Sequence, residues 1–403
     1  MKLYTDMISV ADAATSVVLD EMILTADMPT TAGSQMLCGY RSLFGAEVID
    51  RLAAAGIAVS GKVDVGEFGI DLLGETCFRG ATEKNGELIA PAALALLEGE
   101  AMAAVVLDVN GAPRRAAALA GLTYVKPTYG TVSRYGTIPA ACSGDTIGVM
   151  AKSAADCRRV LSAIAGHDDK DGTSLSDVKI ALTREVKEIR RVLVISDLLL
   201  ENPCDDLAPD MRARIDSVKA ALCERGIEVV EDKNATLSIA HEAWNVLMTA
   251  ELCNNVSRYD GVKFGYRTEN FTNLDELYTN SRTEAFGGLL KLSILYGSDT
   301  LSTENYMSVY DKALRIRRKA VEAFAEIFAD YDAVLLPAAS RTAYTPAELS
   351  AEPTLPFREN RYTAPASITG LPSVVTRGVA FVGPAFSEGS LLDLAALLEK
   401  EGN

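Results

Sequence analysis

The stretch from position 112 to position 148 holds the side chains whose chemistry is of most interest. Ser133, Ser143 and Lys126 lie there among closely spaced Gly and Pro residues, a composition typical of tight turns near a buried site. A serine hydroxyl is a weak nucleophile that needs a proton acceptor, and burial can lower the pKa of a lysine until its amine accepts that proton. Attack on a carbonyl group is the chemistry to consider. The simpler interpretation, which we favour, gives these three residues turn and packing roles.

The elements that must position such groups follow from the apolar periodicity. It predicts helices over 44–55, 91–102, 209–225 and 391–400, one long helix or two over 304–330, and strands over 57–60, 103–107, 191–196, 227–230 and 333–336. Ser153 and Asp156 form a capping-box pattern that opens a further helix, which Gly166 closes. Strands that alternate with helices indicate an α/β fold, with a sheet layered between helices.

Composition narrows the function classes. The 403 residues, 48% of them hydrophobic, can bury a large core in one domain or two. The formal net charge of −16, without a basic cluster, argues against direct binding to nucleic acid. Seven scattered Cys residues indicate a reducing compartment, and we expect a cytoplasmic protein with no membrane segment and no signal peptide. With only His167 and His241, neither a histidine metal site nor a Ser–His triad is expected, and no cofactor is indicated.

Several motifs resemble those of one known family. Residues 126–130 read KPTYG, 133–136 read SRYG and 145–148 read DTIG, and together they resemble the LKPTYG, VSRYG and LDQIGP motifs of the amidase signature family. The resemblance is in particular to the A subunits of glutamyl-tRNA amidotransferases. Residues 258–267 and 281–287 also look like their RYDGVRYGYR and TRSEGFG motifs.

The resemblance spans roughly positions 30 to 381, and residues 365–372 look like the family's PANLAGLP motif. It implies one amidase-signature-like domain over 1–403, with a mixed β-sheet sandwiched between α-helices. The chain departs from the family pattern at both ends. Most of the family's N-terminal helices have no counterpart, so the fold is expected to be N-terminally trimmed, and residues 375–378 join 379–383 without the usual intervening hairpin segment.

Family members hydrolyse amides with a serine nucleophile, a bridging serine in a cis peptide, and a lysine. Aligned on the motifs, these three positions fall on Ala112, Leu88 and Asp20, none of which can take over the role it inherits. The former oxyanion turn and pocket comprise Leu107, Asp108, Val109, Asn110 and Gly111. The former substrate-binding positions are Leu292, Ser293 and Asn360, where the family carries two arginines and an acidic residue.

The resemblance therefore implies a pseudoenzyme that binds a protein partner, a second copy or a small ligand in a remnant pocket. Two alternatives stay open: a hydrolase with altered catalytic residues that uses Asp20 with water, or Ser133 and Ser143, and a true amidotransferase component that pairs with B- and C-type subunits. We expect Asp20, Leu88, Leu107 and Ala112 to converge. An unpaired buried carboxylate is costly, so we also expect that of Asp20 to reach solvent or to pair with a cation, first of all Arg114 or Arg115.

Overall fold

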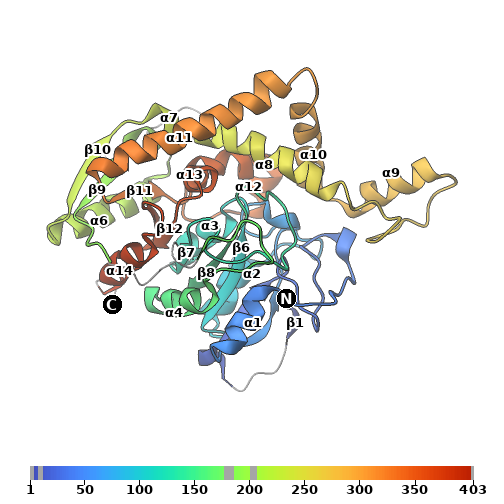
Figure 1. Ribbon diagram of the computed structural model, residues 1–403, viewed down its shortest axis with the longest axis horizontal. Helices are drawn as coiled ribbons and strands as arrows, with labels where there is room; N and C mark the ends of the chain where they lie inside the picture. The colour runs from blue at the N-terminus through green and yellow to red at the C-terminus, as the bar shows by residue number, and fades with distance from the viewer. Residues whose placement is uncertain (1–3, 8–11, 177–185, 200–206, 401–403) are drawn as a thin grey trace.

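Eleven strands form one mixed sheet with helices packed on its faces (Figure 1). The structure, a computed structural model, describes residues 4–7, 12–176, 186–199 and 207–400. The strand order is β1-β3-β2-β6-β8-β7-β12-β13-β11-β9-β10. The strands are β1 (Tyr4–Met7), β2 (Ser16–Asp20), β3 (Ala58–Val63), β6 (Ala103–Asp108), β7 (Thr123–Lys126), β8 (Thr146–Ala151), β9 (Arg191–Ile195), β10 (Glu228–Asp232), β11 (Ala333–Pro337), β12 (Ser373–Thr376) and β13 (Val379–Val382), and β4 (Glu83–Lys84) with β5 (Glu87–Leu88) forms a separate hairpin.

Strand direction divides the sheet into three zones. Strands β3, β2 and β6 are parallel at one end, and β11, β9 and β10 are parallel at the other. The strands between them, and the edge strand β1, pair antiparallel. β2, β6 and β8 are buried along their whole length, because their nearly continuous apolar sequences are covered on both faces of the sheet. The predicted α/β fold, a mixed sheet between helices, is confirmed.

The predicted helices are present with shifted ends, whereas α3, α7, α8, α9, α10, α12 and α13 were not predicted. Ser153 caps its helix as expected, its Oγ accepting the backbone N–H of Asp156 at 3.1 Å. The stretch 304–330, predicted to form one long helix or two, forms the short η5 followed by α11. The helices are α1 (Glu47–Ala54), α2 (Pro91–Leu97), α3 (Ala112–Ala120), α4 (Ala154–Ile164), α6 (Pro209–Glu224), α7 (Ala235–Ser238), α8 (Ala240–Val256), α9 (Leu274–Ala285), α10 (Gly288–Thr300), α11 (Asp311–Asp330), α12 (Pro346–Ala351), α13 (Leu355–Thr369) and α14 (Glu388–Glu399), with single turns η1 (Ala13–Thr15), η2 (Gln35–Leu37), η3 (Glu67–Gly69), η4 (Ser196–Leu198) and η5 (Tyr306–Tyr310).

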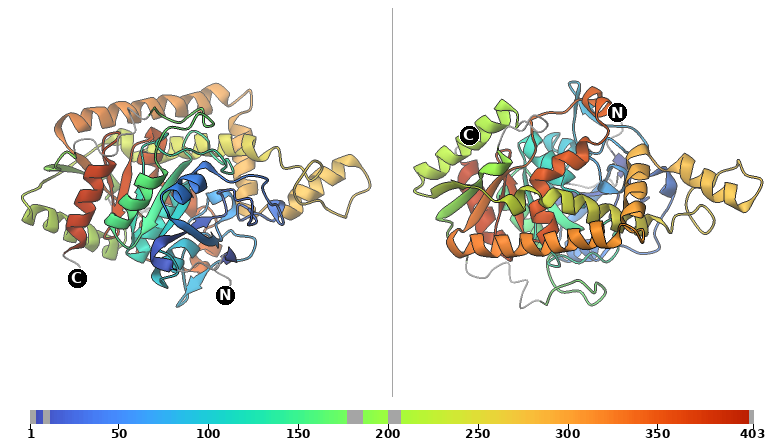
Figure 2. Two further views of the ribbon diagram at one scale, coloured as in Figure 1. Left: turned by 60° about the horizontal axis from the view of Figure 1, so that its bottom comes forward. Right: turned by 90° about the horizontal axis from the view of Figure 1, so that it is seen from above.

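Helix α8 is the centre of a helical layer beside the sheet, where it packs against α10, α11 and α13. The segment between α8 and α10, which contains α9, projects from the body as an arm (Figures 1 and 2). Of the helices that the structure describes, none combines the length and the apolar composition that crossing a bilayer requires.

Helix α11 carries a strip of cations that the net charge conceals. Lys312, Arg315, Arg318 and Lys319 are exposed on it, so the expectation that the chain has no basic cluster is wrong. Three of these cations pair with acidic residues of the same helix. Such pairs contribute little to stability at the surface, and the strip keeps a local positive charge in an acidic protein.

Candidate functional site

The candidate site lies where β2 and β6 end side by side. β2 ends at Asp20, and β6 ends at Asp108 and continues through a three-residue turn into α3. Parallel neighbours place their carboxyl ends at the same edge of a sheet, which is the usual place for ligand sites in such folds. Asp20, Leu107 and Ala112 there line one cavity of about 40 Å³. The structure thus brings three of the sequence-predicted positions together.

The turn before α3 has a fixed geometry. Gly111 has a φ of 81°, and a Cβ atom at this position would lie 2.5 Å from the side chain of Thr363, so glycine is required on both counts. Its backbone N–H donates to Asp108 Oδ1 at 2.9 Å. Asn110 is held on both sides, because its Nδ2 donates to the carbonyl of Ile70 and its Oδ1 accepts from Trp244 Nε1.

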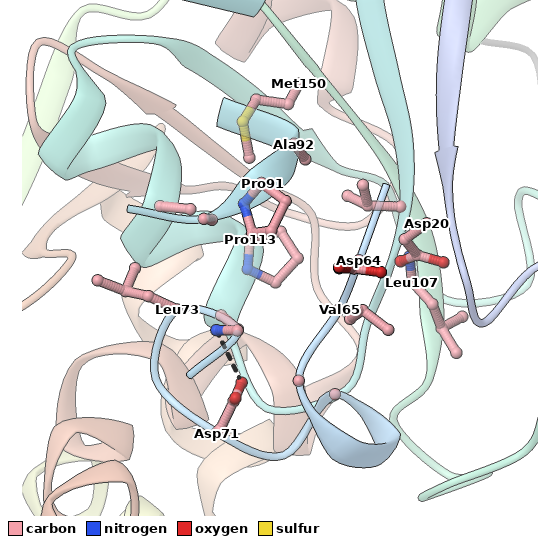
Figure 3. Close-up of a pocket in the computed structure, with 17 residues that line it drawn as sticks. Asp20, Asp64, Val65, Asp71, Leu73, Pro91, Ala92, Leu107, Pro113 and Met150 are labelled. Carbon is pink, nitrogen blue, oxygen red and sulfur yellow. Dashed lines mark hydrogen bonds between the residues drawn. The ribbon is translucent and has the colours of Figure 1, made fainter. Parts of the chain in front are cut away.

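The walls of the cavity contain few functional groups. Figure 3 shows Asp20, Asp64 and Leu107 together on one side of the pocket, with Pro91 and Pro113 across from them. Three aspartate carboxylates are the only ionisable groups among the described lining residues, which include no hydroxyl, thiol, amine or imidazole. The lining comprises Asp20, Asp64, Val65, Gly66, Gly69, Asp71, Leu73, Gly74, Ala90, Pro91, Ala92, Val106, Leu107, Ala112, Pro113, Ala116 and Met150.

Leu88 does not join this cavity. It ends the β4–β5 hairpin and lines a neighbouring cavity of about 240 Å³, which shares Leu73, Ala90 and Ala116 with the first. The expected convergence of four positions is therefore wrong for Leu88. The sequence offset from Ala112 assumed an uninterrupted alignment, whereas Leu88 ends the hairpin and is separated from Ala112 by α2 and β6.

The former substrate-binding positions are also dispersed. Leu292 lies 40% exposed on α10, and Ser293 is buried on the same helix, where its Oγ donates to the carbonyl of Leu289. Neither lines the cavity at Ala112. Asn360 is buried on α13 beside Arg115, one layer behind the cavity wall.

Asp20 is satisfied by backbone groups. Its carboxylate accepts the N–H of Leu107 at 2.7 Å and the N–H of Met22 at 2.9 Å, and the side chain is 3% exposed. The expectation that it reaches solvent or pairs with Arg114 or Arg115 is wrong. Burial raises the pKa of Asp20 to about 7, although the two N–H groups and the charge of Lys62 oppose this shift.

Arg114 points to Asp108. Its Nε lies 2.8 Å from Asp108 Oδ2 and its Nη2 lies 3.0 Å from Oδ1, a bidentate pair in which both side chains are 1% exposed. Burial alone would raise the pKa of Asp108, but the guanidinium overrides burial and holds that pKa below its usual value. Arg114 also donates to the carbonyl of Thr363 and to Ser367 Oγ on α13.

Arg115 supports the opposite wall. It donates to the backbone carbonyls of Asp71 at 2.9 Å and Leu72 at 3.3 Å. The carboxylate of Asp71 in turn accepts from the N–H groups of Gly74 and Thr76, and the contact with Gly74 is drawn in Figure 3. Burial raises the pKa of Asp71 and lowers that of Arg115, so the loop over 71–76 is closed by polar contacts of high desolvation cost.

Two polar residues near the site were not singled out from the sequence. Asp64 follows β3 and pairs with Arg79 at 2.6 Å, while Arg79 also contacts Glu21. Lys62 on β3 is buried, donates to the carbonyl of Pro29 at 3.1 Å, and has its pKa lowered to about 8 by burial. Neither residue lies in the strand predicted over 57–60, but Lys62 belongs to β3 and Asp64 follows it, and β3 pairs in parallel with β2, which ends at Asp20.

Ser133 and Lys126 bind the surrounding loops, whereas the buried Oγ of Ser143 has no hydrogen-bond partner among the described residues and only its backbone N–H donates, to Glu251 Oε2 at 2.8 Å. Ser133 Oγ donates to Asp168 Oδ2 at 2.5 Å, and Lys126 Nζ donates to the carbonyls of Pro127 and Leu371. None of the three lines the cavity at Ala112. Within the described ranges, no group of three or more His, Cys, Asp or Glu side chains is arranged to hold a metal ion.

Comparison with known proteins gives the family. The family described as "Amidase" matches residues 16–86 and 92–392. The chain belongs to the amidase family. It is 36% identical over 387 residues to the A subunit of glutamyl-tRNA(Gln) amidotransferase from Thiobacillus denitrificans (91% of this chain, 79% of the relative), and 34% identical over 409 residues to that from Agathobacter rectalis (96% and 80%).

This amidase-family chain is similar over nearly its whole length to the crystal structure of the glutamyl-tRNA(Gln) amidotransferase A subunit from Thermotoga maritima. The TM-score is 0.79 at 25% identity, over 99% of this chain and 87% of that one. The resemblance to the amidase signature family is therefore confirmed, as is the similarity to its amidotransferase A subunits.

Removing the guanidinium of Arg114 is expected to destabilise this amidase-family protein strongly. Arg114→Gln leaves the buried carboxylate of Asp108 uncompensated, which costs about 3–5 kcal/mol of the free energy of unfolding, measured by urea unfolding. Arg318→Gln is the matched control and changes it by at most about 0.5 kcal/mol, because its pair with Glu322 is exposed. Arg114→Gln combined with Asp108→Asn should lose less than Arg114→Gln alone. An equal loss of unfolding free energy in Arg114→Gln, Arg318→Gln and the double variant would contradict this role of Arg114.

Asp20 makes stability depend on pH with a definite sign. Its pKa is about 7 when folded and 3.8 in the reference state, so its favourable contribution is complete below pH 3.8 and is lost as pH rises through 7. Asp20→Asn removes this dependence. The free energy of unfolding of the variant, relative to the unmodified protein, should be higher at pH 8 than at pH 5.5. Asp50→Asn, on the exposed face of α1, should show no such change, and a flat difference for Asp20→Asn would refute the assignment.

Proposed function

We propose that this chain is a degenerate relative of the glutamyl-tRNA amidotransferase A subunits, without amidase chemistry, which acts by binding a protein partner or a small ligand. One observation carries the proposal: the cavity at Ala112 is lined by apolar side chains and three carboxylates, with no hydroxyl, thiol or amine among its described lining residues. Nucleophilic catalysis of acyl transfer requires such a group next to a proton acceptor.

The turn at 108–111 supports the same conclusion. An oxyanion is stabilised by backbone N–H groups that are free to donate to it. The N–H of Gly111 already donates to Asp108, and the side chain of Asn110 is engaged with Ile70 and Trp244. These contacts fix the shape of the turn. Because the N–H of Gly111 donates to the carboxylate of Asp108, it does not donate to an oxyanion.

The remaining cavity limits what can bind at this site. A single water needs about 10–15 Å³ by the same measure, so a cavity of about 40 Å³ accommodates only a very small ligand unless the walls move. A protein partner is the broader possibility, supported by the relatives, which are named as one subunit of an amidotransferase. A cytoplasmic location is part of this proposal.

The alternative is an amide hydrolase or a glutamine-dependent amidotransferase, part of a carbon–nitrogen ligase complex, with altered catalytic residues. Its support is Asp20, whose raised pKa of about 7 is suited to a general base that activates water. Against it, the described lining of the cavity contains no cation to hold a substrate carboxylate or a developing oxyanion. We therefore rank it second.

We expect no amidase, glutaminase or esterase turnover above the buffer background, because position 112 offers no nucleophile. The measurement is ammonia release from glutamine and hydrolysis of a chromogenic ester by the purified full chain, at pH 6 to 9. Asp20→Asn is the diagnostic variant. Turnover by the unmodified protein that this variant abolishes would overturn the pseudoenzyme proposal in favour of the altered hydrolase.

Restoring the family residues is expected to fail. Ala112→Ser alone, or together with Asp20→Lys and Leu88→Ser, should not give glutaminase activity. A serine at position 88 would line the neighbouring cavity rather than the one at Ala112, and Leu292 stands exposed on α10 where a cationic fork would be required. Circular dichroism would establish that each variant is folded, and glutamine turnover by the triple variant would show that a productive pocket survives.

A further inference from the structure

Exposed apolar side chains are concentrated in one stretch of the chain, which forms the arm, α10 and η5. Nine of the nineteen exposed large apolar side chains among the described residues lie between positions 262 and 307. Single exposed apolar residues are ordinary, but a concentration of them marks an interaction surface. The arm–α10 surface, as we call it, consists of Val262, Phe264, Phe271, Leu274, Leu292, Leu295, Tyr296, Tyr306 and Met307.

Helix α10 holds the most exposed part of this surface in a fixed orientation. Its inner face carries Leu290 and Gly297, and a Cβ atom at Gly297 would lie 2.1 Å from the carbonyl oxygen of Thr249 on α8. Such a close approach prevents α10 from rolling on α8. The outer face is left with Leu292 and Leu295, the latter 69% exposed, at a spacing that places both on one side of a helix.

The arm is also held in a fixed direction at its root. The N–H of Tyr266 donates to the carbonyl of Met36 at 2.7 Å, and the N–H of Gly287 donates to Glu67 Oε2 at 2.8 Å. Arg282 Nη1 donates to the carbonyl of Tyr259 at 2.7 Å. The arm projects from the body next to α10 in all three views (Figures 1 and 2). A projecting segment that is tied down at its root presents its apolar side chains in a defined place.

The low net charge of the arm–α10 surface favours a second copy of the chain as its partner. Residues 262–307 carry four cations and six carboxylates, a formal charge of −2 against −16 for the whole chain, and no charged residue occurs between Lys291 and Asp299. Two copies of so acidic a chain repel each other over most of their surface, but least where this nearly neutral surface meets itself. The basic strip of α11 follows η5 directly, so cations adjoin this end of the surface.

We propose that the arm–α10 surface is a two-fold interface between two copies of this chain, centred on the outer face of α10. The inference rests on the proposed role in binding a protein and names that partner as a second copy. Closed two-fold dimers are the commonest symmetric assembly, and they require a patch that is complementary to itself. The surface consists of aromatic, Leu and Met side chains with few charges, which is the composition of interface cores.

Sedimentation velocity of the full chain, from 1 to 100 µM, tests the proposal. We expect a monomer–dimer equilibrium that Leu295→Glu weakens by at least about tenfold, since each substitution enters a two-fold interface twice and a tenfold change is only about 1.4 kcal/mol. Leu295→Glu with Met307→Glu should give monomers throughout. Leu397→Glu, on the exposed side of α14 and 45% exposed, is the matched control and should leave the equilibrium unchanged.

Hydrogen exchange of the unmodified protein keeps the test independent of variant folding. Amides of α10 and η5 should exchange faster at 1 µM than at 100 µM, whereas those of α14 should not change. A chain that stays monomeric at 100 µM overturns the proposal, and a dimer that Leu295→Glu and Leu397→Glu affect equally places the interface elsewhere. Glutamine turnover tests the proposed function separately, because a monomer without turnover refutes only the dimer.

Discussion

The buried pair between Arg114 and Asp108 is the interaction on which the rest of the site depends. It joins the end of β6 to the first turn of α3, and the same guanidinium reaches Thr363 and Ser367 on α13. Asp108 in addition accepts the N–H of Gly111. A buried ion pair stabilises only when its remaining hydrogen-bonding groups are also satisfied. This pair meets that condition, so strand, turn and two helices are fixed relative to one another.

The residues that surround the site form polar contacts with one another, whereas the cavity itself contains few reactive groups. Asp20, Asp71 and Asp108 are each held by backbone N–H groups or by a guanidinium, so the desolvation that raises the pKa values of the first two is partly offset by hydrogen bonds. Position 112 presents only a methyl group to the cavity. The residues that build a site differ from those that react in it, so the fold alone does not establish an activity.

The cavity and the arm–α10 surface differ in size and in character. The cavity is too small for most ligands, whereas the arm and α10 expose large apolar side chains over an area with little net charge. An acidic chain that repels its neighbours can associate only where its charge is low and its apolar area is high. Both conditions meet on the arm–α10 surface, none of whose side chains lines the cavity at Ala112.

The sequence by itself determined the alternation of strands with helices, the family motifs and the absence of a nucleophile at Ala112, since these depend on local periodicity and residue type. It did not predict α8, α10 and α13, which belong to the helical layer beside the sheet. Only the tertiary structure decided which partners the buried polar side chains bind. Asp20 meets the N–H of Leu107 rather than a cation, because Arg114 is drawn to Asp108 and Arg115 to the loop at Asp71. A buried charge has several candidate partners in the sequence, and the packing of distant segments around it selects one of them.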